Sequence, residues 1–234
     1  MIKAVFFDLD GTLLPLDQEL LIENYFMLLA KKLASFGYEP NTLIKAIKHA
    51  AEAMKKNNGL RTNEAVFWED YTHSIGDQAR THKSLFTDFY KHEFQKLKEI
   101  CGYNYKMARI VKAVREKGLQ VALATNPVFP AIAQESRMRW AGLEPEDFDF
   151  YTSYENIGFT KPNLGYYREL ARRAKVAASE CLMIGNDVED DMVADQLGMR
   201  VFLLTDCLIN NKGDDLSEFP HGDLAEMQSF LSKI

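Results

Sequence analysis

Short apolar runs alternate with longer stretches of helical periodicity along this chain. Each run has four to six residues, which suits a strand buried on both faces of a sheet. These runs cover residues 4–9, 119–124, 181–184 and 200–204. Strands that alternate with helices predict an α/β fold with a doubly wound, Rossmann-like parallel sheet.

Three helices are expected between the later runs. One is indicated by apolar residues at i, i+3, i+4 and i+7, which share a helix face: Met107, Ile110, Val111 and Val114. The other two are expected over residues 163–174 and 189–197, and Gly198 would end the last of them.

The segment between the first and second runs has no strand pattern. Its apolar residues recur at helical spacing in four stretches, with Asn41 as the expected N-cap of the second: 21–29, 43–54, 65–73 and 85–97. We therefore predict a core domain over residues 1–15 and 100–234, with an all-helical cap domain over 16–99 inserted after the first strand.

Two groups of side chains in this insertion are candidates for contact with a ligand. The loop over residues 57–62 is a candidate specificity element, because Arg61 could meet an anionic group of a substrate. The aromatic residues Phe67, Trp68 and Tyr71 recur at helical spacing, and we expect them to pack in the core of the insertion rather than to contact a ligand.

Composition and charge narrow the classes of function. The chain has 234 residues, 47% hydrophobic and 26% charged, as in an ordinary globular protein. Its net charge of −6 excludes the overall cationic field that favours nucleic acid. Neither a signal peptide nor a membrane span is expected, and the three cysteines form no CxxC pair, so we expect a cytoplasmic protein. The sequence contains no signal for the oligomeric state.

Polar residues follow three of the apolar runs. Asp8 and Asp10 end the first, Thr125 and Asn126 follow the second, and Asp187 follows the run at 181–184. Ligands of an open parallel sheet bind beyond the carboxyl ends of its strands. We therefore expect these side chains to converge on one crevice.

Carboxylates in this arrangement indicate cation and phosphate chemistry. Asp8 and Asp10 are two residues apart, so on a strand they point to the same side and repel each other unless a cation lies between them. With Asp187 they form an oxygen-only set of the kind that suits Mg²⁺. Phosphoryl transfer needs such charge neutralisation, and a carboxylate can serve as its nucleophile.

Four motifs in this order resemble those of the haloacid dehalogenase superfamily, and of its phosphatase branch in particular. They are Asp8-Leu9-Asp10-Gly11-Thr12, Thr125, Lys161-Pro162 and the pair Asp187 and Asp191. The resemblance covers residues 1–15 and about 100–210, and the helical segment falls where that superfamily carries its cap. It implies a Rossmann-like core and an enzyme that works through an aspartyl-phosphate.

The resemblance also implies roles for single residues in catalysis. Asp8 would be the nucleophile. Asp10 would protonate the leaving oxygen and then activate water. Thr125 and the backbone of Asn126 would bind the phosphoryl oxygens, and Lys161 would balance the charge of the nucleophile and the phosphate.

The implied Mg²⁺ ligands are Asp8, the carbonyl of Asp10 and Asp187, with Asp191 orienting Lys161 or the metal shell. The fourth motif of the superfamily usually contains Gly followed directly by Asp, whereas Asn186 lies here between Gly185 and Asp187. Asp187 is the favoured ligand because it keeps a four-residue separation from Asp191. Asn186 in the ligand position is the competing register.

The predicted function is a Mg²⁺-dependent phosphohydrolase acting on a small phosphorylated metabolite, a phosphate monoester. Asp10 favours this over a dehalogenase, because a halide needs no proton on leaving whereas an oxygen does. A phosphomutase with the same core is a second alternative. A binding module that holds phosphate without turnover is a third, although it would not require a nucleophile beside a general acid.

Overall fold

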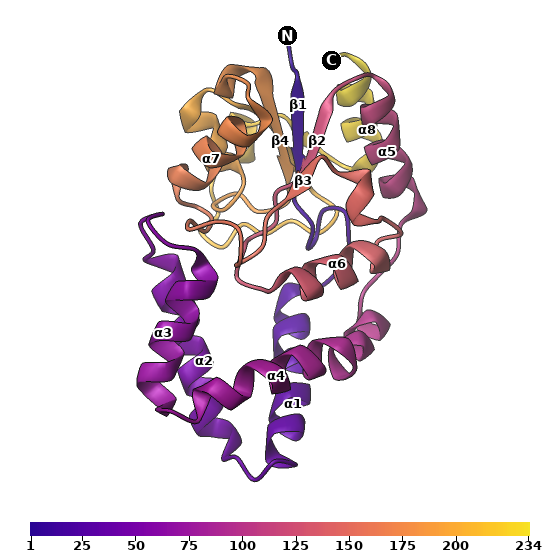
Figure 1. The fold of residues 1–234 in the computed structure, drawn as a ribbon. Helices are drawn as coiled ribbons and strands as arrows, with labels where there is room; N and C mark the ends of the chain where they lie inside the picture. Colours follow the sequence, from indigo (N-terminus) through magenta and orange to yellow (C-terminus); the bar gives the residue numbers. More distant parts are fainter.

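The fold is an α/β sandwich with helices inserted at one end of the sheet (Figure 1). The computed structural model describes residues 1–234 except for the side chain of Arg80. Its six strands are all parallel, in the order β3-β2-β1-β4-β5-β6. They are β1 (Ala4–Phe7), β2 (Gln120–Leu123), β3 (Phe150–Tyr151), β4 (Cys181–Gly185), β5 (Arg200–Leu204) and β6 (His221–Gly222). The predicted parallel α/β fold is confirmed.

Two edge strands, β3 and β6, were not expected from the sequence. Each has only two residues, which is too short to produce a recognisable apolar run. The four predicted runs all form strands, and β1 lies at the centre between β2 and β4.

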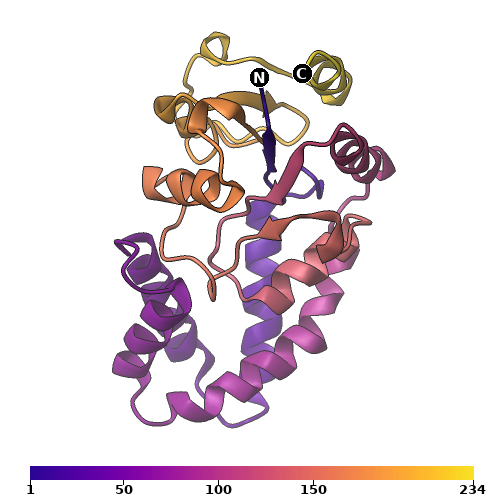
Figure 2. The ribbon, with the colours of Figure 1, turned by 45° about the horizontal axis from the view of Figure 1, so that its top comes forward.

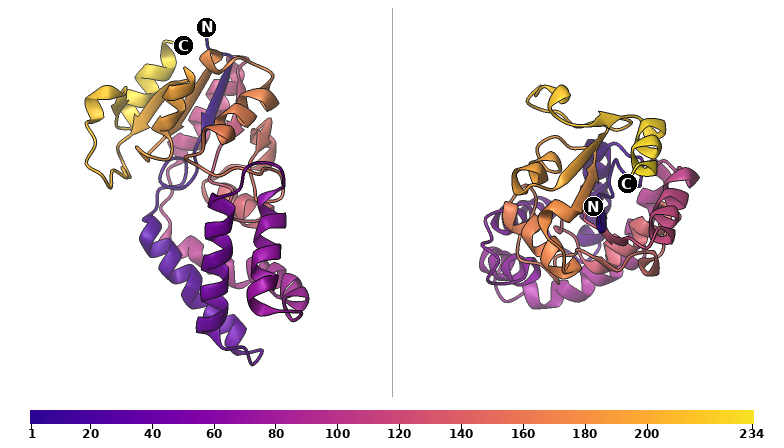
Figure 3. Two further views of the ribbon diagram at one scale, coloured as in Figure 1. Left: turned by 90° about the vertical axis from the view of Figure 1, so that its left-hand side faces the viewer. Right: turned by 90° about the horizontal axis from the view of Figure 1, so that it is seen from above.

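Helices cover both faces of the sheet (Figures 1 and 3). They are α5 (Tyr105–Glu116), α6 (Ala131–Trp140), α7 (Leu164–Ala174) and α8 (Leu224–Ser232), with a 3₁₀ helix η4 (Met192–Leu197). Val5 and Phe7 of β1 belong to the apolar cluster shared with α5 and α8, whereas Ala4 and Phe6 belong to the one shared with α7. This alternation is that of a strand buried on both sides.

The predicted helix positions are largely correct in this part of the chain. The expected face of α5, from Met107 to Val114, is buried. The helix expected over 189–197 is shorter, beginning at Met192, and it ends at Gly198 in the left-handed conformation that glycine favours.

The helical insertion follows β1 and consists of helices alone within its described residues (Figure 2). It contains α1 (Gln18–Ala34), α2 (Pro40–Lys55), α3 (Asn63–Ile75), α4 (Ala79–Lys91) and the 3₁₀ helix η1 (Glu93–Ile100). The helix expected over 85–97 is therefore interrupted at His92. The N-cap of α2 is Glu39 and not Asn41, because Pro40 takes the first helical position and the Glu39 carboxylate accepts from the next two amides.

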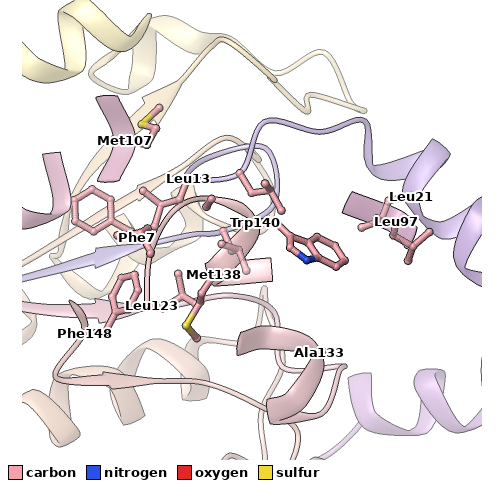
Figure 4. Close-up of a cluster of buried hydrophobic side chains, with 14 of the residues drawn as sticks. Phe7, Leu13, Leu21, Leu97, Met107, Leu123, Ala133, Met138, Trp140 and Phe148 are labelled. Atoms are coloured by element: carbon pink, nitrogen blue, oxygen red, sulfur yellow. The ribbon is translucent and has the colours of Figure 1, made fainter. Parts of the chain in front are cut away.

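One apolar cluster runs from the sheet into the insertion (Figure 4). It joins Phe7 of β1 to Leu21 of α1 and Leu97 of η1, and the ring of Trp140 stacks on Phe94 with centroids 5.2 Å apart. The division into two domains at residues 15 and 100 stays a prediction. Within the described chain, no helix has both the length and the apolar character that crossing a membrane requires.

Candidate active site

The loop after β1 is locked to the loop after β4. The Asp8 amide donates to the Ile184 carbonyl at 2.9 Å, and the Thr12 hydroxyl donates to Asn186 Oδ1 at 2.9 Å. Gly11 has a φ of +83°, and a Cβ there would lie 2.3 Å from the Asn186 amide nitrogen. Only glycine meets both conditions, so the first motif depends on this residue for its turn.

Lys161 joins two buried carboxylates. Its Nζ lies 2.7 Å from Asp8 Oδ1 and 2.5 Å from Asp191 Oδ1, and its side chain is 2% exposed. The Asp191 carboxylate occupies the space where a Cβ of residue 185 would lie, so Gly185 permits its approach. Burial alone would lower the pKa of Lys161, but Asp191 and Asp8 outweigh it and hold that pKa well above its usual value.

The side chains of Asn186 and Asp187 have different partners. Asn186 Oδ1 accepts from Thr12, and its Nδ2 donates to the Cys207 carbonyl at 2.7 Å. Asp187 Oδ1 instead accepts from the amides of Glu189 and Asp190 at 2.8 and 2.9 Å, which stabilises the turn that follows β4. The Asn186 side chain therefore contacts the first motif directly, whereas the Asp187 carboxylate forms hydrogen bonds within its own loop.

Thr125 and Asn126 follow β2 beside these loops. The Thr125 carbonyl accepts from the hydroxyls of Thr152 and Tyr166 at 2.7 and 2.9 Å, which fixes the backbone at this point. Asn126 Nδ2 donates to Asp190 Oδ2 at 3.1 Å. Asn126 Oδ1 is buried and has no hydrogen-bond partner among the described residues.

Arg137 is a buried residue of this region that the sequence analysis missed. It lies on α6, its side chain is 1% exposed, and its guanidinium pairs with Asp10 Oδ2 and with Gln134 Oε1. The guanidinium carbon also lies 4.8 Å from the centroid of the Phe129 ring, a cation–π contact. The other Asp10 oxygen, Oδ1, is buried without a hydrogen-bond partner in the described part of the chain.

A signal for Arg137 does exist in the sequence. Ala133 precedes it by four residues and Trp140 follows it by three, and both are buried. Residues at these spacings share one helix face, so a charged residue between them would be buried and would need a partner. No helix was expected at 131–140, so this signal was not recognised.

One small cavity, of about 40 Å³, is lined by all the residues for which the sequence predicts a role in catalysis or metal binding. It is lined by Asp8, Asp10, Thr125, Asn126, Lys161, Asp187 and Asp191, together with Asn186, Asp190, Gln18 and Ile209. The carboxyl ends of β1, β2 and β4 thus meet as expected. We call this cavity the catalytic pocket, after the role that the sequence predicts for its residues.

The catalytic pocket is rich in carboxylates that disfavour one another's charge. Burial raises the pKa of Asp8, and Asp191 adds to the rise while Lys161 opposes it. Burial also raises the pKa of Asp187, and it raises the pKa of Asp190 to about 6. A divalent cation would favour the ionised form of each group.

This donor set fits Mg²⁺ in its chemistry. Its carboxylate, amide and carbonyl oxygens are hard ligands. No three acidic, histidine or cysteine side chains within the described residues are already arranged around one point. Mg²⁺ typically takes only one or two carboxylates and completes its shell with water and substrate phosphate. The pocket therefore suits such a site better than an all-protein cage.

A family model for haloacid dehalogenase-like hydrolases matches residues 2–198. The chain belongs to this family. This haloacid dehalogenase-like hydrolase is 22% identical to a glyceraldehyde 3-phosphate phosphatase of Methanothermobacter thermautotrophicus, over 93% of this chain and 92% of that one. The resemblance deduced from the four motifs is thereby confirmed, and the chain is a hydrolase.

Solved structures share the fold of this haloacid dehalogenase-like hydrolase. A 2-haloacid dehalogenase of Pseudomonas syringae pv. Tomato superimposes with a TM-score of 0.63 at 22% identity, covering 100% of this chain and 99% of that one. A family enzyme of Bacteroides thetaiotaomicron, in complex with magnesium and inorganic phosphate, gives a TM-score of 0.52 at 19% identity, covering 93% and 98%.

Proposed function

We propose that the protein is a Mg²⁺-dependent phosphatase that hydrolyses a phosphate monoester through an aspartyl-phosphate on Asp8. The observation that carries the proposal is the buried arrangement of Asp8, Lys161 and Asp191, with Asp10 in the same cavity. A lysine held between two carboxylates balances the charge of a nucleophile that receives an anionic phosphoryl group.

The hydrogen bonds of Asp8 and Asp10 indicate which carboxylate oxygen of each residue is available for the first half-reaction. Lys161 binds Asp8 Oδ1, which leaves Asp8 Oδ2 to attack phosphorus. The bond from phosphorus to the leaving oxygen breaks as the bond to Oδ2 forms, and Asp10, which enters this step protonated on Oδ1 with Oδ2 accepting from Arg137, gives that proton to the leaving oxygen. This Asp10 oxygen has no competing partner in the described chain.

The second half-reaction regenerates the enzyme. Asp10, now ionised, takes a proton from water as the water oxygen attacks phosphorus, and the bond to Asp8 Oδ2 breaks. Thr125 and the Asn126 backbone hold the phosphoryl oxygens. Bound Mg²⁺ would neutralise negative charge between the carboxylates and the phosphate. Asp8, the Asp10 carbonyl and either Asp187 or Asn186 would be its ligands.

The curated relative and the carboxyl group at position 10 favour this proposal over its alternatives within the family. One curated relative is a phosphatase, and one structural relative binds magnesium and phosphate. Another structural relative is a dehalogenase. Asp10 favours an oxygen leaving group, because a leaving halide requires no proton. A phosphomutase would release no free phosphate, and a silent binding module would show no turnover.

We further propose that the helical insertion, residues 16–99, acts as a cap over the catalytic pocket. Asn63 of α3 donates from Nδ2 to the carbonyls of Pro127 and Phe159, at 3.3 and 3.1 Å, and its amide donates to the Ile157 carbonyl at 2.8 Å. These bonds attach the start of α3 to the core, both at Pro127, which follows Asn126, and at Ile157 and Phe159, which precede Lys161. Closure of this kind excludes water from the reaction.

The specificity role expected for Arg61 has no support in the geometry. Its guanidinium pairs with Glu69 and donates to the Ala65 carbonyl, and it does not line the catalytic pocket. Gly59 and Gly158 instead let this loop approach the core, since a Cβ on Gly158 would lie 2.2 Å from the Arg61 carbonyl oxygen.

The test is phosphate release from an aryl phosphate with Mg²⁺ or with EDTA. We expect release only with Mg²⁺ and a loss of at least about 1,000-fold in Asp8→Asn, which lacks the nucleophile. Asp195→Asn is the matched control, because Asp195 is exposed and lies outside the catalytic pocket. Turnover by Asp8→Asn equal to that of the control would rule out the proposed intermediate.

A further inference from the structure

An apolar chamber of about 350 Å³ lies between the helical insertion and the loop at residues 128–130 of the core. Eight aromatic residues line it, from α1, α3, α4 and the core, among them Tyr25, Phe26, Phe67, Trp68 and Tyr154. Phe67 and Trp68, expected to be core residues of the insertion, thus also form chamber wall. The volume falls at the lower end of the range for small-molecule sites, about 300–1,000 Å³.

A third cavity, of about 390 Å³, shares walls with both the chamber and the catalytic pocket. It shares Ile22, Lys55, Val128 and Phe129 with the chamber. It shares Asp10, Asn126 and Lys161, among others, with the catalytic pocket. The three cavities thus adjoin one another in a row from Asp8 to the aromatic walls, and a ligand with its phosphate at Asp8 would reach the chamber by way of the third cavity.

The polar groups that line the chamber mostly have partners in its own wall. Lys48 Nζ lies over the Phe26 ring, 4.9 Å from its centroid. The hydroxyls of Tyr25 and Tyr90 bond each other at 3.0 Å, and Lys55 pairs with Glu52 at 2.7 Å. Trp68 Nε1 is buried, and the Tyr154 hydroxyl is the neighbouring acceptor in the same wall. A sugar would leave several hydroxyls without partners against these walls, which is unfavourable, whereas an apolar body gains from leaving water.

We propose that the apolar chamber binds the alcohol part of the substrate, and that the substrate is a phosphate monoester of an apolar alcohol about the size of an aromatic ring. The inference rests on the proposed phosphatase function. It narrows the expectation of a small phosphorylated metabolite, because the walls that its alcohol part would meet are mainly aromatic.

The test compares esters whose leaving alcohols are all primary: ethyl phosphate, glucose 6-phosphate and 2-phenylethyl phosphate. We expect kcat/KM for 2-phenylethyl phosphate to exceed that for each of the other two by at least about 30-fold, since one methylene in an apolar pocket is worth about tenfold or more. 2-Phenylethanol should inhibit ethyl phosphate hydrolysis competitively.

A variant that fills the chamber identifies where this preference arises. Ala51 of α2 lines the chamber, whereas Ala53 on the same helix does not. Ala51→Trp should reduce the preference for the phenylethyl ester at least tenfold and abolish inhibition by 2-phenylethanol, and Ala53→Trp should retain both. If Ala51→Trp is inactive toward every ester, Ala51→Leu takes its place, with a smaller shift in the same direction.

The possible outcomes distinguish failure of the apolar-substrate proposal from failure of the proposed phosphatase function. Hydrolysis of all three esters with equal kcat/KM, or a preference that Ala51→Trp and Ala51→Leu leave unchanged, would overturn the apolar substrate and leave the phosphatase standing. The chamber would then be a packing gap of the insertion. No phosphate release from any ester, with the protein folded and Mg²⁺ present, would overturn both.

Discussion

Lys161→Met removes the one positive charge that two buried carboxylates share, while keeping a side chain of similar length. The ammonium lies 2.7 Å from Asp8 Oδ1 and 2.5 Å from Asp191 Oδ1. At an effective dielectric constant of about 20, each attraction amounts to roughly 6 kcal/mol before the cost of desolvation is subtracted. Removing one partner of a buried ion pair typically costs about 3–5 kcal/mol, so we expect the free energy of unfolding to fall by about 4 kcal/mol at pH 8.

The loss should depend on pH in a definite direction. Burial already raises the pKa of Asp8 in the presence of Lys161, and without it the folded-state pKa rises further above the unfolded value of about 3.9. A carboxyl whose pKa is raised by folding binds more protons in the folded state, so its penalty is absent below the unfolded pKa and grows as the pH rises from there to the folded-state pKa. The variant should therefore be closer to wild type at pH 5 than at pH 8.

Urea unfolding of the variant and the wild type at both pH values, in EDTA, measures this difference. Replacing EDTA with Mg²⁺ should restore part of the stability that the variant loses. Turnover of an aryl phosphate by the variant should fall at least about 100-fold. Lys96→Met is the control, since Lys96 is exposed on η1. A loss below about 1 kcal/mol, or one of equal size at pH 5 and pH 8, would refute the reasoning from buried charge.

Further variants test Asp187, Arg137 and Glu169. Asp187→Asn keeps an oxygen for the turn but loses its charge, so the Mg²⁺ concentration for half-maximal activity should rise about tenfold or more; a rise in Asn186→Ala alone would assign the ligand to residue 186. Arg137→Gln frees Asp10 from its ion pair and should lower kcat of the folded enzyme by about 10- to 100-fold with little change in KM; unchanged kcat would show that the pair does not position Asp10. Hydrogen bonds from Arg172, with Arg173, lower the pKa of Glu169 to about 2. Glu169→Gln should therefore lose about 1 kcal/mol at pH 7, allowing for solvent screening, and progressively less as the pH falls below about 4.5 in urea unfolding; a constant loss from pH 7 to pH 3 would contradict this.

The sequence alone was informative where the structure depends on local pattern. A strand buried on both faces must be continuously apolar, so β1, β2, β4 and β5 were visible as runs, whereas the two-residue strands β3 and β6 were not. Residues that end parallel strands lie at one edge of the sheet whatever the details of packing. For this reason the positions of Asp8, Thr125 and Asp187 along the chain were enough to predict that they share one pocket.

The local pattern of apolar and polar residues could not predict contacts between segments that are distant in the sequence. Arg137 meets Asp10 across 127 positions of the chain, and the partner of Asn186 is Thr12, 174 positions away. The apolar chamber exists only because α1 and α3 of the insertion face the loop that contains Phe129. Periodicity determines which face of each element is apolar, and so it determined the sheet and its acidic edge. Tertiary packing decides which faces meet and what space remains between them, and so it alone decided the partner of Asp10 and the shape of the chamber.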